Sequence, residues 1–154
     1  MEIKELEFET AAPNHLSSVL SLLKRFKLPV EDVESQLANF VVLRNQDQIV
    51  GCAGLEVYGS IALLRSVAVH PDWQGRSLGK QLVDHMMNRA HNEGVERVYL
   101  LTETGKVYFQ KFGFRSLRRD EVDDRIKKTE EFTKLCPESS IPMVRDLTPV
   151  FASF

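Results

Sequence analysis

Cysteine is scarce in this chain of 154 residues, which has only Cys52 and Cys136. Cys52 lies inside an apolar run and Cys136 precedes a proline, so neither shows the paired spacing of a zinc site or a disulfide framework. We therefore expect two reduced thiols in a cytoplasmic protein. The 4 histidines are scattered without ligand spacing, and the sequence predicts no metal site.

A surplus of charge is missing as well. The chain has 20 Lys and Arg residues against 22 Asp and Glu residues, a formal net charge of −2. This balance supplies no field that would favour nucleic acid or an anionic membrane surface, so any anion must be bound locally. No apolar run is long enough to span a bilayer, and the N-terminal residues lack a secretion signal. We expect neither a nucleic-acid partner nor a membrane partner.

The chain does contain enough apolar material for one core. Its length is usual for a single domain, and 43% of its residues are hydrophobic. No repeat, low-complexity stretch or linker interrupts it. We therefore expect one domain spanning residues 1–154.

Apolar periodicity predicts strands and helices in alternation. Asn14 is expected to cap the first helix, which Pro29 stops. Antiparallel strands then precede a strand-helix-strand-helix unit, which indicates a mixed α/β sheet. The expected strands are Ile3 to Phe8, Phe40 to Leu43, Ile49 to Val57, Ile61 to Val69, Val98 to Leu101 and Ile141 to Leu147. The expected helices are Leu16 to Phe26, Leu78 to Ala90, a short helix ending at Phe112, and a surface helix from Asp120 to Leu135.

The most informative stretch runs from Val67 to Lys80, where a buried strand passes through a glycine-containing turn into a helix. Free backbone N–H groups and the positive end of the helix dipole point out of a helix N-terminus. A diphosphate can therefore bind there, and small residues let it approach the main chain. Arg76 and Lys80 add positive charge. The alternative is that Gly75 and Gly79 only shape a turn.

Two other nucleotide motifs are excluded by counting. A Walker loop needs four residues between its glycines and a Ser or Thr after the lysine. Here three residues separate Gly75 from Gly79, and Gln81 follows Lys80. The G-x-G-x-x-G pattern of dinucleotide-binding folds is absent too.

The stretch resembles the acyl-CoA signature of the GNAT acetyltransferase superfamily, a strand ending Val-x-Val-x-Pro followed by Gln/Arg-x-x-Gly-x-Gly. The signature aligns with Gln74 to Gly79, with Ser77 in place of the first glycine. Downstream, Tyr108 to Phe114 resembles the family's helix and Gly-Phe ending, so the resemblance covers nearly the whole chain. It implies a GNAT fold, with antiparallel N-terminal strands and a central parallel pair that splays to admit pantetheine.

A narrower resemblance is to the GNAT proteins of arsenic-resistance operons, in Ala62 to Val69, Leu100 to Thr104 and Thr129 to Pro137. Similarity to the acetyltransferase domain of N-acetylglutamate synthases is weaker and lies in the same strand and helix. These likenesses imply direct transfer of an acetyl group from acetyl-CoA to a small-molecule amine, an amino acid or an arsenic- or phosphorus-containing analogue. They also imply a homodimer, since relatives often associate through their C-terminal strands.

Two alternatives stay open. One is a protein N-terminal or lysine acetyltransferase. The other is a catalytically silent acyl-CoA-binding regulatory module, which Ser77 and Phe109 motivate as departures from the family pattern.

The resemblance also implies which residues contact acetyl-CoA. Pantetheine would pair with a strand edge, and the pyrophosphate would lie on the amides of the turn. The expected contacts are Val67, Ala68, Val69, Gln74, Gly75, Arg76, Ser77, Leu78, Gly79, Lys80, Thr102 and Phe109.

Attack of an amine on a thioester needs an uncharged nitrogen, a stabilised oxyanion and a proton for the departing thiolate. Glu56, at a strand end, is the expected base, acting through water, with Glu103 in reserve; the alternative for Glu56 is a solvated carboxylate. Many relatives have a tyrosine acid where this chain has Phe109. Tyr108 is one residue earlier, which turns its side chain by roughly 100° on a helix. Tyr108 is therefore either the acid or a packing residue.

Arg65 places a permanent charge inside an apolar strand, which is costly unless it meets an anion. We expect it to bind the carboxylate or other oxyanion of an amino-acid-like substrate, with help from Ser66. An ion pair with Glu56 or another acid is equally open. Trp73, beside the turn, is expected to pack.

Overall fold

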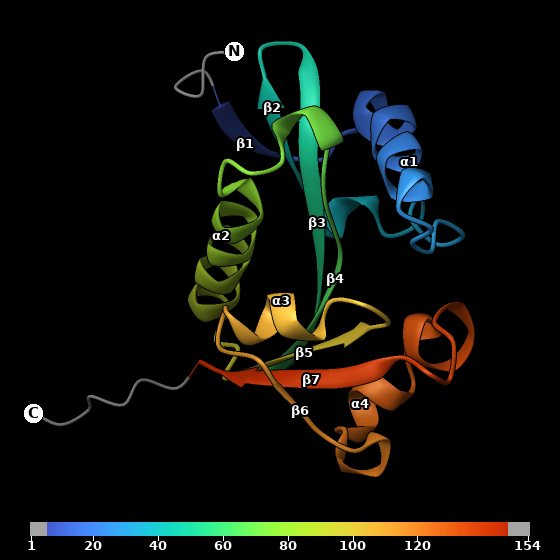
Figure 1. Ribbon diagram of the computed structural model, residues 1–154. Coiled ribbons are helices and arrows are strands. Elements are labelled where there is room, and N and C mark those ends of the chain that lie inside the picture. The colour runs from blue at the N-terminus through green and yellow to red at the C-terminus, as the bar shows by residue number, and fades with distance from the viewer. Residues whose placement is uncertain (1–5, 148–154) are drawn as a thin grey trace, which may run out of the picture. The chain divides into compact units, whose positions relative to one another are not determined.

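The computed structural model describes residues 6–147, so Ile3 of the first expected strand lies outside the described residues. Its strands are β1 (Leu6–Thr10), β2 (Phe40–Asn45), β3 (Gln48–Tyr58), β4 (Ile61–Val69), β5 (Arg97–Thr102), β6 (Arg115–Ser116) and β7 (Ile141–Asp146). Its α-helices are α1 (Leu16–Arg25), α2 (Leu78–Asn92), α3 (Lys106–Gln110) and α4 (Asp124–Lys127). The strands form a sheet in the order β1-β2-β3-β4-β5-β7-β6, which confirms the predicted mixed α/β architecture (Figure 1).

The described chain divides into two compact parts. The first part contains residues 6–55 and 65–86, and the second contains residues 56–64 and 87–147. β3, β4 and α2 contribute residues to both parts. We describe each part by itself, and the expected single domain stays a prediction.

In the first part, β1, β2 and β3 form an antiparallel ladder with α1 on one face and α2 on the other. Val42 and Cys52, which are register partners, join the core cluster that includes the α1 residues Val19 and Leu23. The neighbouring positions point the other way, because side chains alternate along a strand. There, Gly51 faces Leu82 of α2, and α2 also supplies His85, whose ring stacks on Phe8 of β1 at 4.1 Å.

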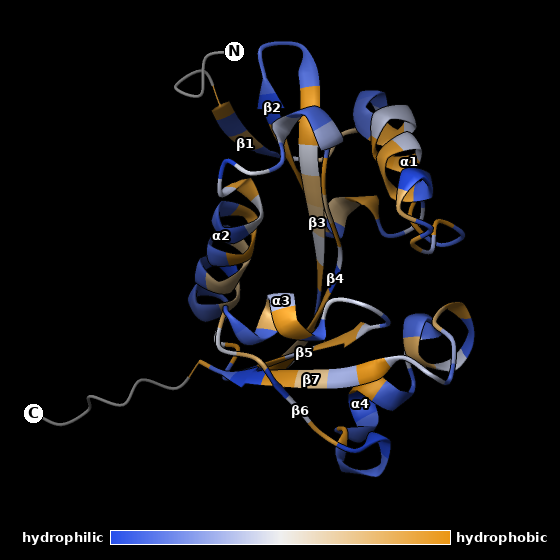
Figure 2. Ribbon diagram, viewed as in Figure 1, coloured by the Kyte–Doolittle hydropathy of each residue, from blue (hydrophilic) through white to orange (hydrophobic). Residues whose placement is uncertain are grey.

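The second part is held by β5 and β7, which pair antiparallel over the full length of both strands. β6 adds two pairs to the other edge of β7. The start of β4 runs parallel to β5 over three pairs, from Ile61 with Arg97 to Leu63 with Tyr99. Figure 2 shows the mostly hydrophobic colouring of β4 and β5, in contrast to the hydrophilic turn between β2 and β3. These hydrophobic strands are the buried centre that the sequence predicts.

The first helix starts at Leu16 as expected, but Asn14 is not its cap. Pro13–His15 forms a 3-10 turn, and His15 takes the N-cap position of α1. Pro13 fixes the backbone of this turn, and the His15 Nδ1 accepts the N–H of Ala12 at 2.9 Å. The imidazole therefore closes the turn ahead of α1.

The predicted surface helix from Asp120 to Leu135 is wrong. The segment contains a 3-10 turn, the 4-residue helix α4 and a wide turn at Glu131–Leu135. Asp123 starts α4 by accepting the N–H of Arg125, and Thr129 ends it because its hydroxyl donates to the carbonyl of Ile126 at 2.7 Å. Local side-chain hydrogen bonds of this kind compete with a continuous helix.

Among residues 6–147, no helix combines the length and apolar composition that crossing a membrane requires.

Replacing Gly51 tests the close approach of β3 to α2. A Cβ at Gly51 would lie 2.9 Å from Leu82 Cδ1 and 3.2 Å from the carbonyl oxygen of Ala68. We expect Gly51→Ala to lower the free energy of unfolding by about 1–3 kcal/mol through overpacking, measured by urea denaturation. Gly94→Asn is the control, because Gly94 is open and its positive φ suits asparagine. Equal losses in the two variants would contradict the packing argument.

Candidate active site

The junction between β4 and α2 forms a left-handed turn at the open end of a helix. After β4, residues Pro71–Trp73 make one 3-10 turn, and α2 begins at Leu78. The first α-helical hydrogen bond runs from the N–H of Gln81 to the carbonyl of Ser77 at 3.1 Å. The amides just before Gln81 therefore lie at the helix opening, where an α-helix has no internal acceptor for them.

Two residues of this turn have positive φ, Gly75 at 80° and Ser77 at 64°. Nothing lies within 4 Å of the position of a Cβ on Gly75, so the main chain there is open to a ligand. Ser77 is exposed and adopts the conformation that glycine takes without strain. Ser77, which stands where the signature has its first glycine, thus adopts a backbone conformation that favours glycine.

The turn carries charge and is tied to β4. The amide side chain of Gln74 donates to the carbonyl of Val69 at 3.1 Å, which joins the turn to the end of the strand. The Arg76 guanidinium lies 5.1 Å from the centre of the Trp73 ring, and Lys80 pairs with Asp84 at 2.7 Å. Trp73 is buried, as expected, and its indole nitrogen has no hydrogen-bond partner within the described part of the chain.

β4 is distorted where the expected pantetheine edge begins. Ser66 has a φ of 57°, and its carbonyl accepts the Cys52 Sγ–H at 3.4 Å. Ala68 is buried, whereas Val67 and Val69 are partly exposed. The turn and this edge belong to the same compact part, so the structure brings these predicted contact residues together.

Arg65 meets an acid that sequence reasoning missed. Its guanidinium binds both carboxylate oxygens of Asp32, at 2.5 and 2.7 Å, and both side chains are buried. This is an ion pair with another acid, one of the two alternatives that the sequence left open. Because Asp32 engages both terminal nitrogens, substrate binding by Arg65 stays a prediction that this contact disfavours. The sequence offers only a weak indication of Asp32, which is one acid in an irregular segment and precedes the buried Val33.

In the second part, Glu56 is buried and accepts a short hydrogen bond from the Tyr58 hydroxyl. The solvated alternative for Glu56 does not fit this burial. Tyr58 was also missed, although residues two apart on a strand share a face and the pairing follows from that rule. The reserve base, Glu103, is exposed.

Thr102 and Phe109, two further expected contacts, surround Gly105. The Thr102 hydroxyl accepts the N–H of Gly105 at 2.8 Å, and a Cβ on Gly105 would lie 3.1 Å from the Phe109 ring. Tyr108 is 40% exposed and its ring packs edge-on against Phe109. Partial burial raises the pKa of Tyr108, so its hydroxyl keeps its proton at neutral pH.

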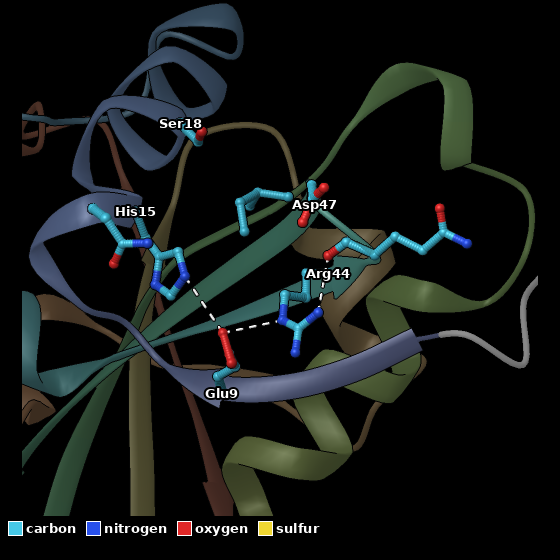
Figure 3. A pocket seen from close by; sticks show the side chains of 8 residues that line it. Glu9, His15, Ser18, Arg44 and Asp47 are labelled. Carbon is cyan, nitrogen blue, oxygen red and sulfur yellow. Dashed lines mark hydrogen bonds and ion pairs between the residues drawn. The ribbon is translucent and has the colours of Figure 1, made fainter.

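A separate hollow of about 370 Å³ lies beside β1 and the turn between β2 and β3 (Figure 3). Glu9 sits between His15 and Arg44, 3.4 Å from the His15 Nε2 and 3.1 Å from the Arg44 Nε. Arg44 also binds Glu7 at 2.8 Å. Because two carboxylates already neutralise the Arg44 charge, Arg44 is not available to bind an anionic ligand in this hollow.

Residues 6–147 offer neither a metal-binding cluster nor a reactive thiol at Cys52. No group of three His, Cys, Asp or Glu side chains there could hold a metal ion. Burial raises the pKa of Cys52 to about 12, so this thiol stays protonated and unreactive.

Comparison with known proteins identifies the fold. A family model described as an acetyltransferase (GNAT) domain matches residues 36–116. An amino-acid acetyltransferase of Mannheimia succiniciproducens is 34% identical over 96 residues, which are 61% of this chain and 21% of that protein. The chain thus spans about a fifth of the length of this curated relative.

Two solved structures share the architecture. The N-acetylglutamate synthase of Neisseria gonorrhoeae, complexed with coenzyme A and L-arginine, has a TM-score of 0.79 at 22% identity, covering 94% of this chain and 34% of that one. The protein Rv2747 of Mycobacterium tuberculosis, also in complex with CoA, has a TM-score of 0.78 at 20% identity, covering 92% of this chain and 99% of that one. The predicted GNAT fold is confirmed, whereas the arsenic-resistance likeness stays a prediction. Because the family model covers more than half of the sequence, this protein belongs to the GNAT acetyltransferase family.

Proposed function

We propose that this chain is an acetyl-CoA-dependent N-acetyltransferase whose acceptor is the amine of a small molecule, an amino acid or an amino-acid analogue. The observation that carries the proposal is the turn from Gln74 to Lys80. It combines two left-handed residues, open space at Gly75 and the amides at the start of α2. Family membership supports the same chemistry, and the relatives named amino-acid acetyltransferases support the acceptor class.

The turn fits a diphosphate by shape and by charge. Amides at a helix opening attract an anion, and Arg76 adds a guanidinium that is steadied on the Trp73 ring. Gly75 lets the phosphates reach the main chain without a side chain in the way. Bound there, acetyl-CoA would supply the activated acetyl group. The edge of β4 at Val67 and Val69 would then hold the pantetheine arm.

Direct transfer requires the amine nitrogen to form a bond to the acetyl carbon while the carbon–sulfur bond breaks. The nitrogen loses a proton and the sulfur gains one. Glu56 is the candidate base because it is a buried carboxylate held by Tyr58. Backbone amides of β4 are the candidate donors to the oxyanion. Tyr108 has a proton to give at neutral pH, and water is the other source.

The other enzymatic candidate, acetylation of a protein N-terminus or lysine, uses the same turn and differs in the acceptor. A silent acyl-CoA-binding module would bind the donor without turnover. A cytoplasmic location and a homodimer stay predictions.

The donor site is tested with matched glycine variants. Gly75 and Gly94 have φ values of 80° and 82°, and a Cβ at either would meet nothing within 4 Å. Valine strains both positions equally, but only Gly75 lies in the turn. By calorimetry we expect Gly75→Val to weaken acetyl-CoA binding by roughly tenfold or more, and Gly94→Val to leave it within about twofold.

Turnover is then measured as thiol release from acetyl-CoA over a panel of amino acids and peptides. Release that depends on an amino acid is the expected result. Release with peptides alone would favour protein acetylation, and binding without any release would identify a silent module. Absence of binding to the unaltered protein would overturn the proposal.

Ser77 offers a test of strain in the turn. Ser77→Gly should raise the free energy of unfolding by about 0.5–1 kcal/mol, because glycine adopts positive φ freely. Ser17→Gly, the same substitution in the exposed first turn of α1, should lower it by about 0.5 kcal/mol. Denaturant titration measures both. A loss of stability in Ser77→Gly would show that the serine hydroxyl matters more than the backbone strain.

Glu56→Gln tests the base. At neutral pH the acceptor amine is mostly protonated, so losing the base should lower kcat/KM by roughly 10². The loss should shrink as the pH rises, since the solvent then supplies the free amine. Glu103→Gln, an exposed carboxylate, should change kcat/KM by less than about twofold. An equal loss for Glu56→Gln at every pH would assign it a structural role.

A further inference from the structure

The pair of Arg65 and Asp32 is among the most enclosed charges of the first part. The Arg65 side chain is 0% exposed and that of Asp32 is 7% exposed, with both guanidinium nitrogens on the carboxylate. The Phe40 ring lies 5.6 Å from the guanidinium carbon, and a Cβ on Gly54 would lie 3.1 Å from the Arg65 Cγ. A two-point contact packed in this way fixes both side chains in one geometry.

One end of this pair reaches the distorted residue of β4. The Arg65 Nε donates to the Ser66 hydroxyl at 3.1 Å. Ser66 is not glycine, yet it has a φ of 57°, a conformation that persists only where its surroundings enforce it. The guanidinium and the Cys52 thiol each bind Ser66, so both help to hold its left-handed conformation.

The other end holds an irregular segment. Between α1 and β2, residues 28–37 contain neither a strand nor an α-helix. The segment is attached through the buried side chains of Val33 and Leu37 and through Asp32. The Asp32 carbonyl also accepts the hydroxyl of Ser35 at 2.9 Å. Asp32 is therefore the charged anchor of the segment on β4.

The place of this anchor along β4 suggests a role in acceptor binding, an inference that rests on the proposed function. With the diphosphate at Gln74 to Lys80 and the pantetheine along Val69 and Val67, the donor runs backwards along the strand. Its thioester end then lies toward Ser66. The segment held by Asp32 is thus fastened to β4 at the end where an amine must reach the acetyl carbon.

We propose that Arg65 and Asp32 are positioning residues that fasten segment 28–37 to the distorted residue Ser66 and so set the approach of the acceptor amine. They do not touch the substrate. A buried ion pair adds little net stability compared with apolar packing. Its two directional hydrogen bonds, however, specify one arrangement of the segment on β4. Apolar side chains at both positions would cover the same area without fixing the register of the segment on the strand.

The test combines hydrogen exchange with kinetics on the full chain. Asp32→Asn keeps the shape of the side chain and removes its charge. We expect faster amide exchange in residues 31–37 and 66–69, while the exchange of β5 and β7 is unchanged. We further expect kcat/KM for the amine to fall by about tenfold or more, and KM for acetyl-CoA to change by less than about twofold.

Two further variants complete the design. Asp32→Glu retains the charge and should recover most of the protection and of kcat/KM. Asp146→Asn is the matched control, because Asp146 also pairs with an arginine, Arg97 at 2.8 Å, but is half exposed. It should change neither readout. Should Asp32→Asn not fold, Arg65→Lys carries the same test, since lysine keeps the charge and loses the two-point contact.

Uniform loss of protection across the protein, or equal changes in the kinetic constants of amine and acetyl-CoA, would overturn the proposal. A rise in KM for carboxylate-bearing amines alone would instead return Arg65 to substrate binding. The exchange readout needs no activity, so its outcome stands even if the chain proves unable to acetylate. The two proposals therefore fail separately.

Discussion

The proposed donor site depends on the main-chain N–H groups at the start of α2, which have no acceptor within the helix. A helix always leaves its first amides without internal acceptors, and most proteins cover them with a capping side chain or water. Here the chain arrives from β4 through Gly75 and Ser77, which have positive φ and are exposed. The burial of β4 and of the inner face of α2 fixes the two ends of this turn, and its shape follows from them.

Strong local patterns made much of the fold predictable. β4 matches its predicted bounds because a nearly continuous apolar run of nine residues is stable only when it is buried, here as a strand inside the sheet. The bounds of α2, β2 and β3 also agree with the predicted ranges to within two residues at each end. The segment after β6 was not, because its apolar residues recur at helical spacing while Asp123 and Thr129 hydrogen-bond to nearby backbone groups and break the helix. Spacing reports which side chains are buried, but it does not report competing local hydrogen bonds.

At the candidate site, the strand-turn-helix junction followed from the sequence, whereas the partner of Arg65 did not. The ligand contacts of the turn residues stay predictions. A buried guanidinium demands an anion, and that much can be reasoned from a single strand. Asp32 is 33 residues away in an irregular segment, so choosing it requires the tertiary structure. The contact between Glu56 and Tyr58 was easier to predict, since alternation along one strand places both side chains on the same face. Contacts within an element are readable from sequence, and contacts between elements mostly are not.

The single tryptophan of the chain, Trp73, lies next to the turn from Gln74 to Lys80, with the Arg76 guanidinium over its ring. Because no other indole is present, the tryptophan emission of the protein, excited selectively over its three tyrosines, arises at this one place. Any occupant that draws Arg76 toward itself would alter that emission. The protein thus carries an optical probe of its own, and the state of the turn can be followed in dilute solution without attaching a dye.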